Sequence, residues 1–232
     1  MRRITFVLGM LLGIVVAIPI FIRSLLRGMR AFHEHGTVCR AEVTALDEAG
    51  RALAGSARVR FSPASGDADA PGQTIIGCAI KFGENQDVAL ATFEKLLGIP
   101  DGTKHTNVTD YFANQYPSAT PWRVRGLGDV WFRLIPNAPI ATDGVRSAWL
   151  DAQIAAGAAT LTLETRSAPY PDGPLRVKLV EIKLVAREPQ DDPKFHISMF
   201  RSGKGVSATG LRNGVRSIVY PFSQLGRTIR GG

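Results

Sequence analysis

The first hydrophobic run of the chain extends over nineteen residues without a charge, from Ile4 to Ile22. A helix of about 20 apolar residues crosses the roughly 30 Å hydrocarbon core of a bilayer, so this run predicts a transmembrane helix. Residues 23–27 (RSLLR) do not have the A-x-A-like pattern of small residues of a signal-peptide cleavage site, which predicts that the helix stays attached. Residues 1–29 are therefore expected to form a single-pass membrane anchor with its juxtamembrane segment.

The flanking charges and two glycines add detail to this anchor. Arginines are more numerous after the apolar run than before it, which favours a cytoplasmic location for the rest of the chain. Gly9 and Gly13 have the G-x-x-x-G spacing, which lets two helix backbones approach closely. We expect contact with membrane lipid and, through this glycine face, with other transmembrane helices, either of a membrane complex or of a homodimer.

Short β-branched stretches bounded by turn residues follow the anchor and predict strands. Residues 36–46, 57–62 and 74–82 come in succession and suggest an antiparallel meander. Farther along, residues 129–135 predict another strand. Residues 160–165 and 175–187 predict a hairpin, and the alternation slips near Leu179 and Val180, as it does at a β-bulge.

Two segments have helical spacing. Residues 86–98 carry apolar side chains three and four positions apart, which predicts a helix, and residues 146–156 predict a shorter one. Residues 100–125 are polar and rich in Asn, Thr, Tyr and Pro, which predicts a long loop with one helical turn at residues 110–115. Residues 30–232 are thus expected to form one mixed α+β domain.

Charge and cysteine content narrow the classes of partner. The chain carries a formal charge of +8, from 28 Lys and Arg against 20 acidic residues, which suits nucleic acid, anionic lipid or an acidic protein. Because the basic residues are scattered singly, with no zinc-finger or helix-turn-helix pattern, no nucleic acid is expected as a partner. Cys39 and Cys78 lack a C-x-x-C spacing and are expected to be buried side chains.

Four short motifs follow one another along the domain. Residues 30–44 read RAFHEHGTVCRAEVT, residues 59–62 VRFS, residues 77–82 GCAIKF and residues 216–221 RSIVYP, with Arg227 seven residues after the tyrosine. In this order they resemble the haem catalases, whose R-x-x-H-x-x-G segment leads into a strand ending in E-V-T and is followed by V-R-F-S, G-F-A-V-K-F and R-x-x-x-Y-P segments. The resemblance implies a catalase-like antiparallel β-barrel core with a few helices, preceded by the transmembrane helix.

The resemblance also implies a set of residues that would bind haem b. Tyr220 would be the axial ligand of the haem iron, and Arg216, one helical turn earlier, would hold its phenolate in the ionised form. Forked guanidinium groups suit the two propionates of the haem, and by resemblance these would come from Arg30, Arg60 and Arg227.

On the opposite side of the haem, His33 would be the catalytic acid and base that moves a proton between the two oxygens of a peroxide. Ser62 would hold its imidazole by a hydrogen bond. The implied function is that of a membrane-anchored catalase-like haem protein acting on hydrogen peroxide or on organic and lipid hydroperoxides. A haem carrier or sensor would need the arginines and Tyr220 but no distal catalyst.

The sequence departs from the catalase pattern in ways that favour a different class of function. Catalases place a distal asparagine four or five residues after the aspartate of a D-L-V-x-N-N segment, whereas Ala91 and Thr92 stand at those positions after Asp87. The wrapping arm and the C-terminal helical region of the family have no counterpart in these residues. The alternative is a haem-less, catalase-derived accessory or stabilising subunit of a larger membrane protein complex, so the sequence leaves enzymatic activity open.

Overall fold

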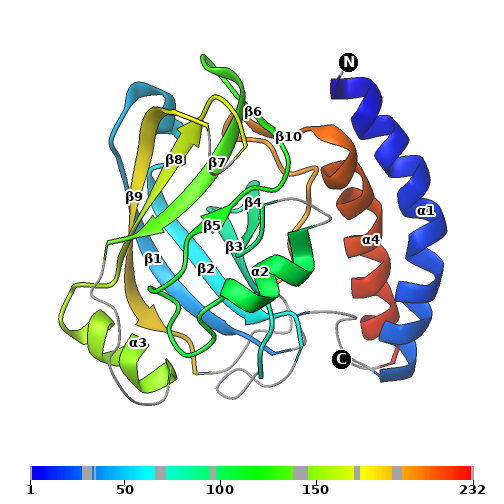
Figure 1. The fold of residues 1–232 in the computed structure, drawn as a ribbon, viewed down its shortest axis with the longest axis horizontal. Coiled ribbons are helices and arrows are strands. Elements are labelled where there is room, and N and C mark those ends of the chain that lie inside the picture. The colour runs from blue at the N-terminus through cyan, green and yellow to red at the C-terminus, as the bar shows by residue number, and fades with distance from the viewer. Residues whose placement is uncertain are drawn as a thin grey trace.

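A computed structural model describes residues 2–27, 33, 35–65, 72–94, 98–137, 146–169, 173–189 and 195–230 of the chain. The strands in these residues form one antiparallel sheet that curls into a nearly closed barrel, and two long helices lie side by side against it (Figure 1). The predicted α+β class, with an antiparallel barrel, few helices and an apolar N-terminal helix, is confirmed.

The first half of the barrel is an antiparallel meander. Its strands are β1 (Thr37–Ala45), β2 (Gly55–Pro63), β3 (Ile76–Phe82) and β4 (Gln86–Ala91). A 3-10 helix, η1 (Glu48–Leu53), joins β1 to β2. In β3 fully buried and partly exposed side chains alternate, because one face of the strand covers the core. The three strands expected after the anchor are thus confirmed.

The second half of the sheet continues from β1 to β9 and ends at β10. Its strands are β5 (Tyr116–Pro117), β6 (Trp122–Val124), β7 (Gly128–Pro136), β8 (Thr160–Arg166), β9 (Leu175–Arg187) and β10 (Val206–Ala208). The β8–β9 hairpin is confirmed. Leu163 pairs with Val180 and Glu164 with Lys178, so Leu179 is the extra residue of the expected bulge.

The helix expected over residues 86–98 is wrong in its first half, because residues 86–91 form β4. All six residues of this strand are buried, so the strand has no polar alternation, and its apolar residues also fit a helical spacing. The long loop expected over residues 100–125 is wrong in part, because it contains most of α2 (Ile99–His105) together with β5 and β6. Residues 110–115 form turns, and α3 (Arg146–Ala155) confirms the second predicted helix.

The two long helices are α1 (Arg2–Arg27) and α4 (Gly210–Ile229). They run in the same direction, and α4 lies between α1 and the barrel (Figure 1). Small residues make the contact: Gly9 faces the backbone of Leu211, and Gly13 faces Val215, while Gly214 of α4 faces Phe6 and Gly9. The G-x-x-x-G face of α1 is therefore covered by a helix of the same chain.

The other side of α1 is apolar and exposed. By length and composition α1 can cross a membrane, a property that signal sequences share. Large aliphatic side chains cover its outer face, among them Ile4 and Val15, which are 64% and 67% exposed. The helix thus has a small-residue side toward α4 and a bulky apolar side away from the domain.

Replacement of Gly9 with leucine is expected to destabilise the helix pair, because a side chain at this position clashes with the carbonyl of Leu211. Overpacking costs about 1–3 kcal/mol, which lowers the Tm of a domain of this size by roughly 2–12 °C. Tryptophan fluorescence of the detergent-solubilised full chain measures this shift. The matched control, Val15→Leu on the exposed side, should change the Tm by no more than about 2 °C. Equal Tm values for the two variants would show that α1 does not pack on α4 at Gly9.

Candidate functional site

The residues singled out in the sequence come from two parts of the fold. The barrel contributes His33, which precedes β1, together with Arg60 and Ser62 of β2, and α4 contributes three more. Arg30 lies outside the described residues. On α4 the residues are Arg216, Tyr220 and Arg227.

The imidazole of His33 is held against the barrel wall. Its Nδ1 lies 3.0 Å from the carbonyl oxygen of Ser62 and 3.2 Å from the hydroxyl oxygen of the same residue. Since a carbonyl only accepts, Nδ1 carries the hydrogen and Nε2 keeps a lone pair. A Cβ on Gly77 would lie only 2.9 Å from the ring, so this glycine of β3 provides the space for the imidazole.

The backbone of His33 is unusual and is fixed by neighbouring groups. Its φ is +57°, in the left-handed region that residues with side chains rarely adopt. The Nη2 of Arg60 donates to the carbonyl of His33 over 2.9 Å, and the His33 N–H donates to Ala64 over 3.3 Å. Strained backbone of this kind persists where the surroundings determine it, and here these bonds determine the position of the ring.

Burial and positive charge keep His33 neutral. Burial of the ring lowers the pKa of His33 to about 4, and the charges of Arg60 and Arg216 act in the same direction. The hydrogen bond to the Ser62 carbonyl opposes this shift. At neutral pH the imidazole is therefore neutral, with a lone pair on Nε2. The effect of Arg216 on the pKa also means that this arginine of α4 lies near His33.

The barrel side of α4 collects positive charge and unsatisfied donors. Tyr220 packs against the barrel core, and Arg216 lies one turn before it, with Nη1 3.5 Å from the carbonyl of Ala89. Arg212, a further turn back, stacks over the ring of Phe93 at 4.2 Å. Burial and the charge of Arg216 lower the pKa of Arg212 to about 9, so it is still charged at neutral pH.

Two buried donors in this region have no partner among the described residues. Among the described residues, neither Nη1 of Arg212 nor Nδ2 of Asn213 has a hydrogen-bond partner, although both atoms are buried. Sequence reasoning missed these two residues. The spacing of four between Arg212 and Arg216 places both on one helix face, and this spacing could have revealed the first of them.

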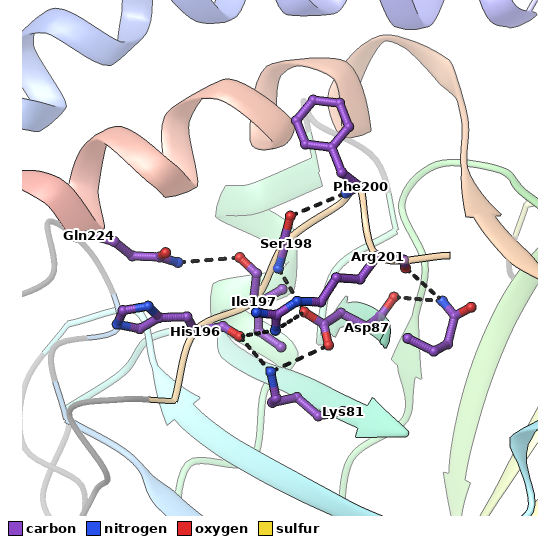
Figure 2. A network of polar contacts seen from close by, with 9 residues as sticks. Lys81, Asp87, His196, Ile197, Ser198, Phe200, Arg201 and Gln224 are labelled. Carbon is purple, nitrogen blue, oxygen red and sulfur yellow. Dashed lines mark hydrogen bonds and ion pairs between the residues drawn. The ribbon is translucent and has the colours of Figure 1, made fainter. Parts of the chain in front are cut away.

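Arg227 joins α4 to a polar network on the barrel. Its Nη2 lies 2.7 Å from Nε2 of His196, in the segment before β10. Figure 2 shows the network around this segment, in which Lys81 Nζ and Arg201 Nη1 both donate to the carbonyl of His196, over 3.0 and 3.2 Å. Gln224 of α4 donates to the carbonyl of the next residue, Ile197.

The centre of this network is the fully buried side chain of Asp87 on β4. Its Oδ2 accepts from the backbone N–H of Ser198 over 2.8 Å and from Arg201 over 3.1 Å, and its Oδ1 lies 3.7 Å from Lys81 (Figure 2). Burial raises the pKa of Asp87 and lowers the pKa of Lys81, while the charge of each partner opposes the shift of the other. Burying these charged side chains costs desolvation energy, which their mutual attraction offsets. The network therefore serves to position α4 and the segment before β10 that contains His196.

Ala91 and Thr92, at the end of β4, stand at the two positions where the catalase pattern has its distal asparagine. Ala91 is buried, and the hydroxyl of Thr92 accepts from the N–H of Ile76 over 3.0 Å and lies 2.6 Å from the hydroxyl of Thr106. These contacts occupy the Thr92 hydroxyl within the barrel. No amide side chain stands at either position, so a peroxide bound near His33 would lack that hydrogen bond.

The chemistry of the described residues fits a haem. The barrel holds a neutral imidazole near Arg216 of α4, and this helix also carries a tyrosine phenol and further cationic side chains but no acidic residue. Buried donors of Arg212 and Asn213 on this helix have no partner among the described residues and could bind an acceptor such as a carboxylate. Among these residues Tyr220 would supply the iron ligand, and Arg60, Arg216 and Arg227 would supply positive charge.

Comparison with known proteins supports the fold. A fungal catalase of known crystal structure superposes on 86% of this chain with a TM-score of 0.63 and 15% sequence identity. The chain spans 59% of the length of that catalase. No family model and no curated protein sequence matches the chain. The fold is therefore catalase-like. At this low sequence identity the comparison shows a similar fold and nothing about activity.

The lowered pKa of His33 gives the stability of the protein a pH dependence. An unfolded imidazole titrates near pH 6.5 and the folded one at about 4, so between these values the unfolded state binds more protons. The stabilisation is complete above about pH 6.5 and is lost as the pH falls toward 4. We expect the Tm of the detergent-solubilised chain to fall more between about pH 7.5 and about pH 5 than the Tm of His33→Gln. Parallel curves for the two proteins would contradict the burial of a neutral imidazole.

Proposed function

We propose that the chain is a membrane-associated catalase-like haem protein that acts on hydroperoxides, with haem b held between His33 and Tyr220. The observation that carries the proposal is the buried, neutral imidazole of His33, which is held at Nδ1 by the barrel and lies close enough to Arg216 of α4 for that charge to lower its pKa. A tyrosine-ligated haem would use a neutral base on one of its faces and a tyrosine with nearby arginines on the other. His33, Tyr220 and the arginines of this chain provide those residue types.

The residues divide the work between binding and proton transfer. A bound haem would supply the redox chemistry of its iron, and Tyr220 would hold that iron through its phenolate oxygen. Arg60 and Arg227 are the candidates for binding the propionates, with Arg30 as a further candidate outside the described residues. His33 would take the proton from one peroxide oxygen at Nε2 and return it to the other oxygen as the O–O bond breaks.

Organic hydroperoxides are the preferred substrate class in this proposal. Dismutation of hydrogen peroxide in catalases uses the distal asparagine, whose place is taken by Ala91 and Thr92. Reduction of a hydroperoxide R–O–O–H needs two electrons and two protons, which two molecules of a phenolic donor provide, and yields R–O–H and water. The apolar N-terminal helix would bring the domain to peroxidised acyl chains.

The absorption spectrum tests the haem ligand. We expect the full-length protein, expressed with haem precursor, to show the intense band of a tyrosinate-ligated haem at the blue edge of the visible spectrum, and Tyr220→Phe to lose it. Tyr111→Phe is the matched control, since it removes one buried phenol hydroxyl, 3.2 Å from Thr37, on the barrel and not on α4. Retention of the band by Tyr220→Phe would refute tyrosine ligation.

The role of His33 is tested by turnover. His33→Gln should keep the absorption band and lose about 10²–10⁴-fold in the rate of cumene hydroperoxide reduction with a phenolic donor. An unchanged rate would contradict the role of His33 as the proton carrier. It would point to a haem carrier or sensor.

A second candidate function is a haem-less accessory subunit of a membrane protein complex. It is favoured by the hydroxyl of Thr92, which is bonded within the barrel where catalases use an amide. Folded protein that shows no haem band after expression with precursor, together with a stable membrane protein partner on purification, would support this function over the first.

A further inference from the structure

The outer face of the α1–α4 pair is an extended apolar surface that no part of the described chain covers. We propose that α1 lies along α4 in the plane of the membrane, and that this face docks the domain onto a bilayer with anionic headgroups without crossing it. The proposal does not depend on haem binding, because it concerns the outer side of α4 and not the side toward the barrel.

Contacts at both ends fix α1 along the length of α4. At the N-terminal end Gly9 faces Leu211. At the other end the hydroxyl oxygens of Ser24 and Ser223 lie 2.9 Å apart, and Ser24 is fully buried. Between them Ala17 is also fully buried. Because the helices run in the same direction, each step along α1 keeps a partner on α4 (Figure 1).

Polar contacts hold α4 to the barrel in turn. Thr209, its N-cap residue, donates to the carbonyl of Pro121 over 2.7 Å, Gln224 donates to Ile197, and Arg227 lies against His196. If α1 crossed a bilayer in this arrangement, α4 and the adjoining barrel wall would lie at the same depth. Irregular backbone does not occur exposed to lipid in the hydrocarbon region, and charged side chains there are rare and costly. The axis of α1 must therefore run along the membrane surface while α1 stays packed on α4.

The composition of this face suits the interface of a bilayer. On α1, Ile4, Val15 and Leu26 are 64%, 67% and 65% exposed, and on α4 Leu225 and Ile229 are 51% and 60% exposed. An interfacial helix buries its apolar side to the level of the acyl chains while its other side stays polar. Here the side of α1 away from the bilayer is covered by α4, which separates α1 from the barrel (Figure 1).

Charge at the edges of the face favours anionic lipid. Neither α1 nor α4 contains an acidic residue. Arg3 lies near one end of the face, and Arg23, Arg27 and Arg230 lie at the other. Basic residues beside an inserted apolar face are attracted to anionic headgroups, and the apolar residues then enter beneath them.

The depth of three labelled positions tests the orientation of α1. Single cysteines replace Ile4, Val15 or Leu26 in the full chain, carry an environment-sensitive fluorophore, and are placed in liposomes of phosphatidylcholine and phosphatidylglycerol with spin-labelled quencher lipids. Ile4 and Leu26 are roughly 33 Å apart along the helix. We expect one shallow depth for all three labels. A Val15 label at the bilayer centre, with the other two near the headgroups, would overturn the proposal. Cys39 and Cys78 are buried, so unsubstituted protein treated in the same way gives the background.

A crosslink tests whether α1 stays on α4 in the membrane. The double variant Ser24→Cys, Ser223→Cys should form a disulfide in the same liposomes under mild oxidation, leaving only Cys39 and Cys78 to react with a maleimide after denaturation. The control pair Val15→Cys, Ser223→Cys should not form one, since Val15 lies on the exposed side. Absence of the Ser24–Ser223 crosslink would mean that α1 leaves α4, and the proposal would fail.

Dependence on headgroup charge is measured by flotation. Full-length protein diluted from detergent should bind liposomes that contain phosphatidylglycerol at least about tenfold more tightly than pure phosphatidylcholine liposomes, because the arginines interact with the anionic headgroups. Equal binding would overturn the preference for anionic lipid. None of these readouts involves haem absorption or peroxide turnover, so failure here is distinct from failure of the proposed function.

Discussion

The buried carboxylate of Asp87 is the group on which the placement of α4 depends. It accepts from Ser198 and Arg201, and that segment in turn presents the His196 ring to Arg227 and the Ile197 carbonyl to Gln224. Removing one member of a buried ion pair typically costs about 3–5 kcal/mol, because the other charge is left in a poorly solvated place. Because Asp87 is buried, its contacts are costly to break, and through them β4 holds the segment that contacts α4, the helix that carries Tyr220.

Two separate supports thus hold the two halves of the candidate site. The barrel fixes His33 through Ser62, Arg60 and the space above Gly77, with no contribution from α4 to these contacts. The Asp87 network and α1 fix α4 from its two sides. The separation between the imidazole and the phenol is consequently set by how α4 sits on the barrel, and contacts far from either ring control it.

Local patterns allowed much of the barrel to be predicted and left the longer-range contacts open. The strands β1 to β3 and the bulge at Leu179 follow from alternation and turn residues, which act over a few positions. β4 was predicted as a helix because a strand buried on both sides shows no alternation. The glycines of α1 predict a close helix contact, but spacing alone does not identify the partner, which is α4. Asn213 was missed because its burial depends on packing against the barrel.

The pairing of α1 with α4 has a consequence for biosynthesis. About 180 residues separate the end of α1 from the start of α4 along the chain. At the usual 5–20 residues per second, a ribosome exposes α1 for roughly 10–40 s before α4 is made. Throughout that interval the glycine face of a highly apolar helix has no partner in its own chain. Docking of α4 onto α1 is then the last step of folding, and under the proposed membrane association the nascent chain would reach the membrane before the barrel is complete.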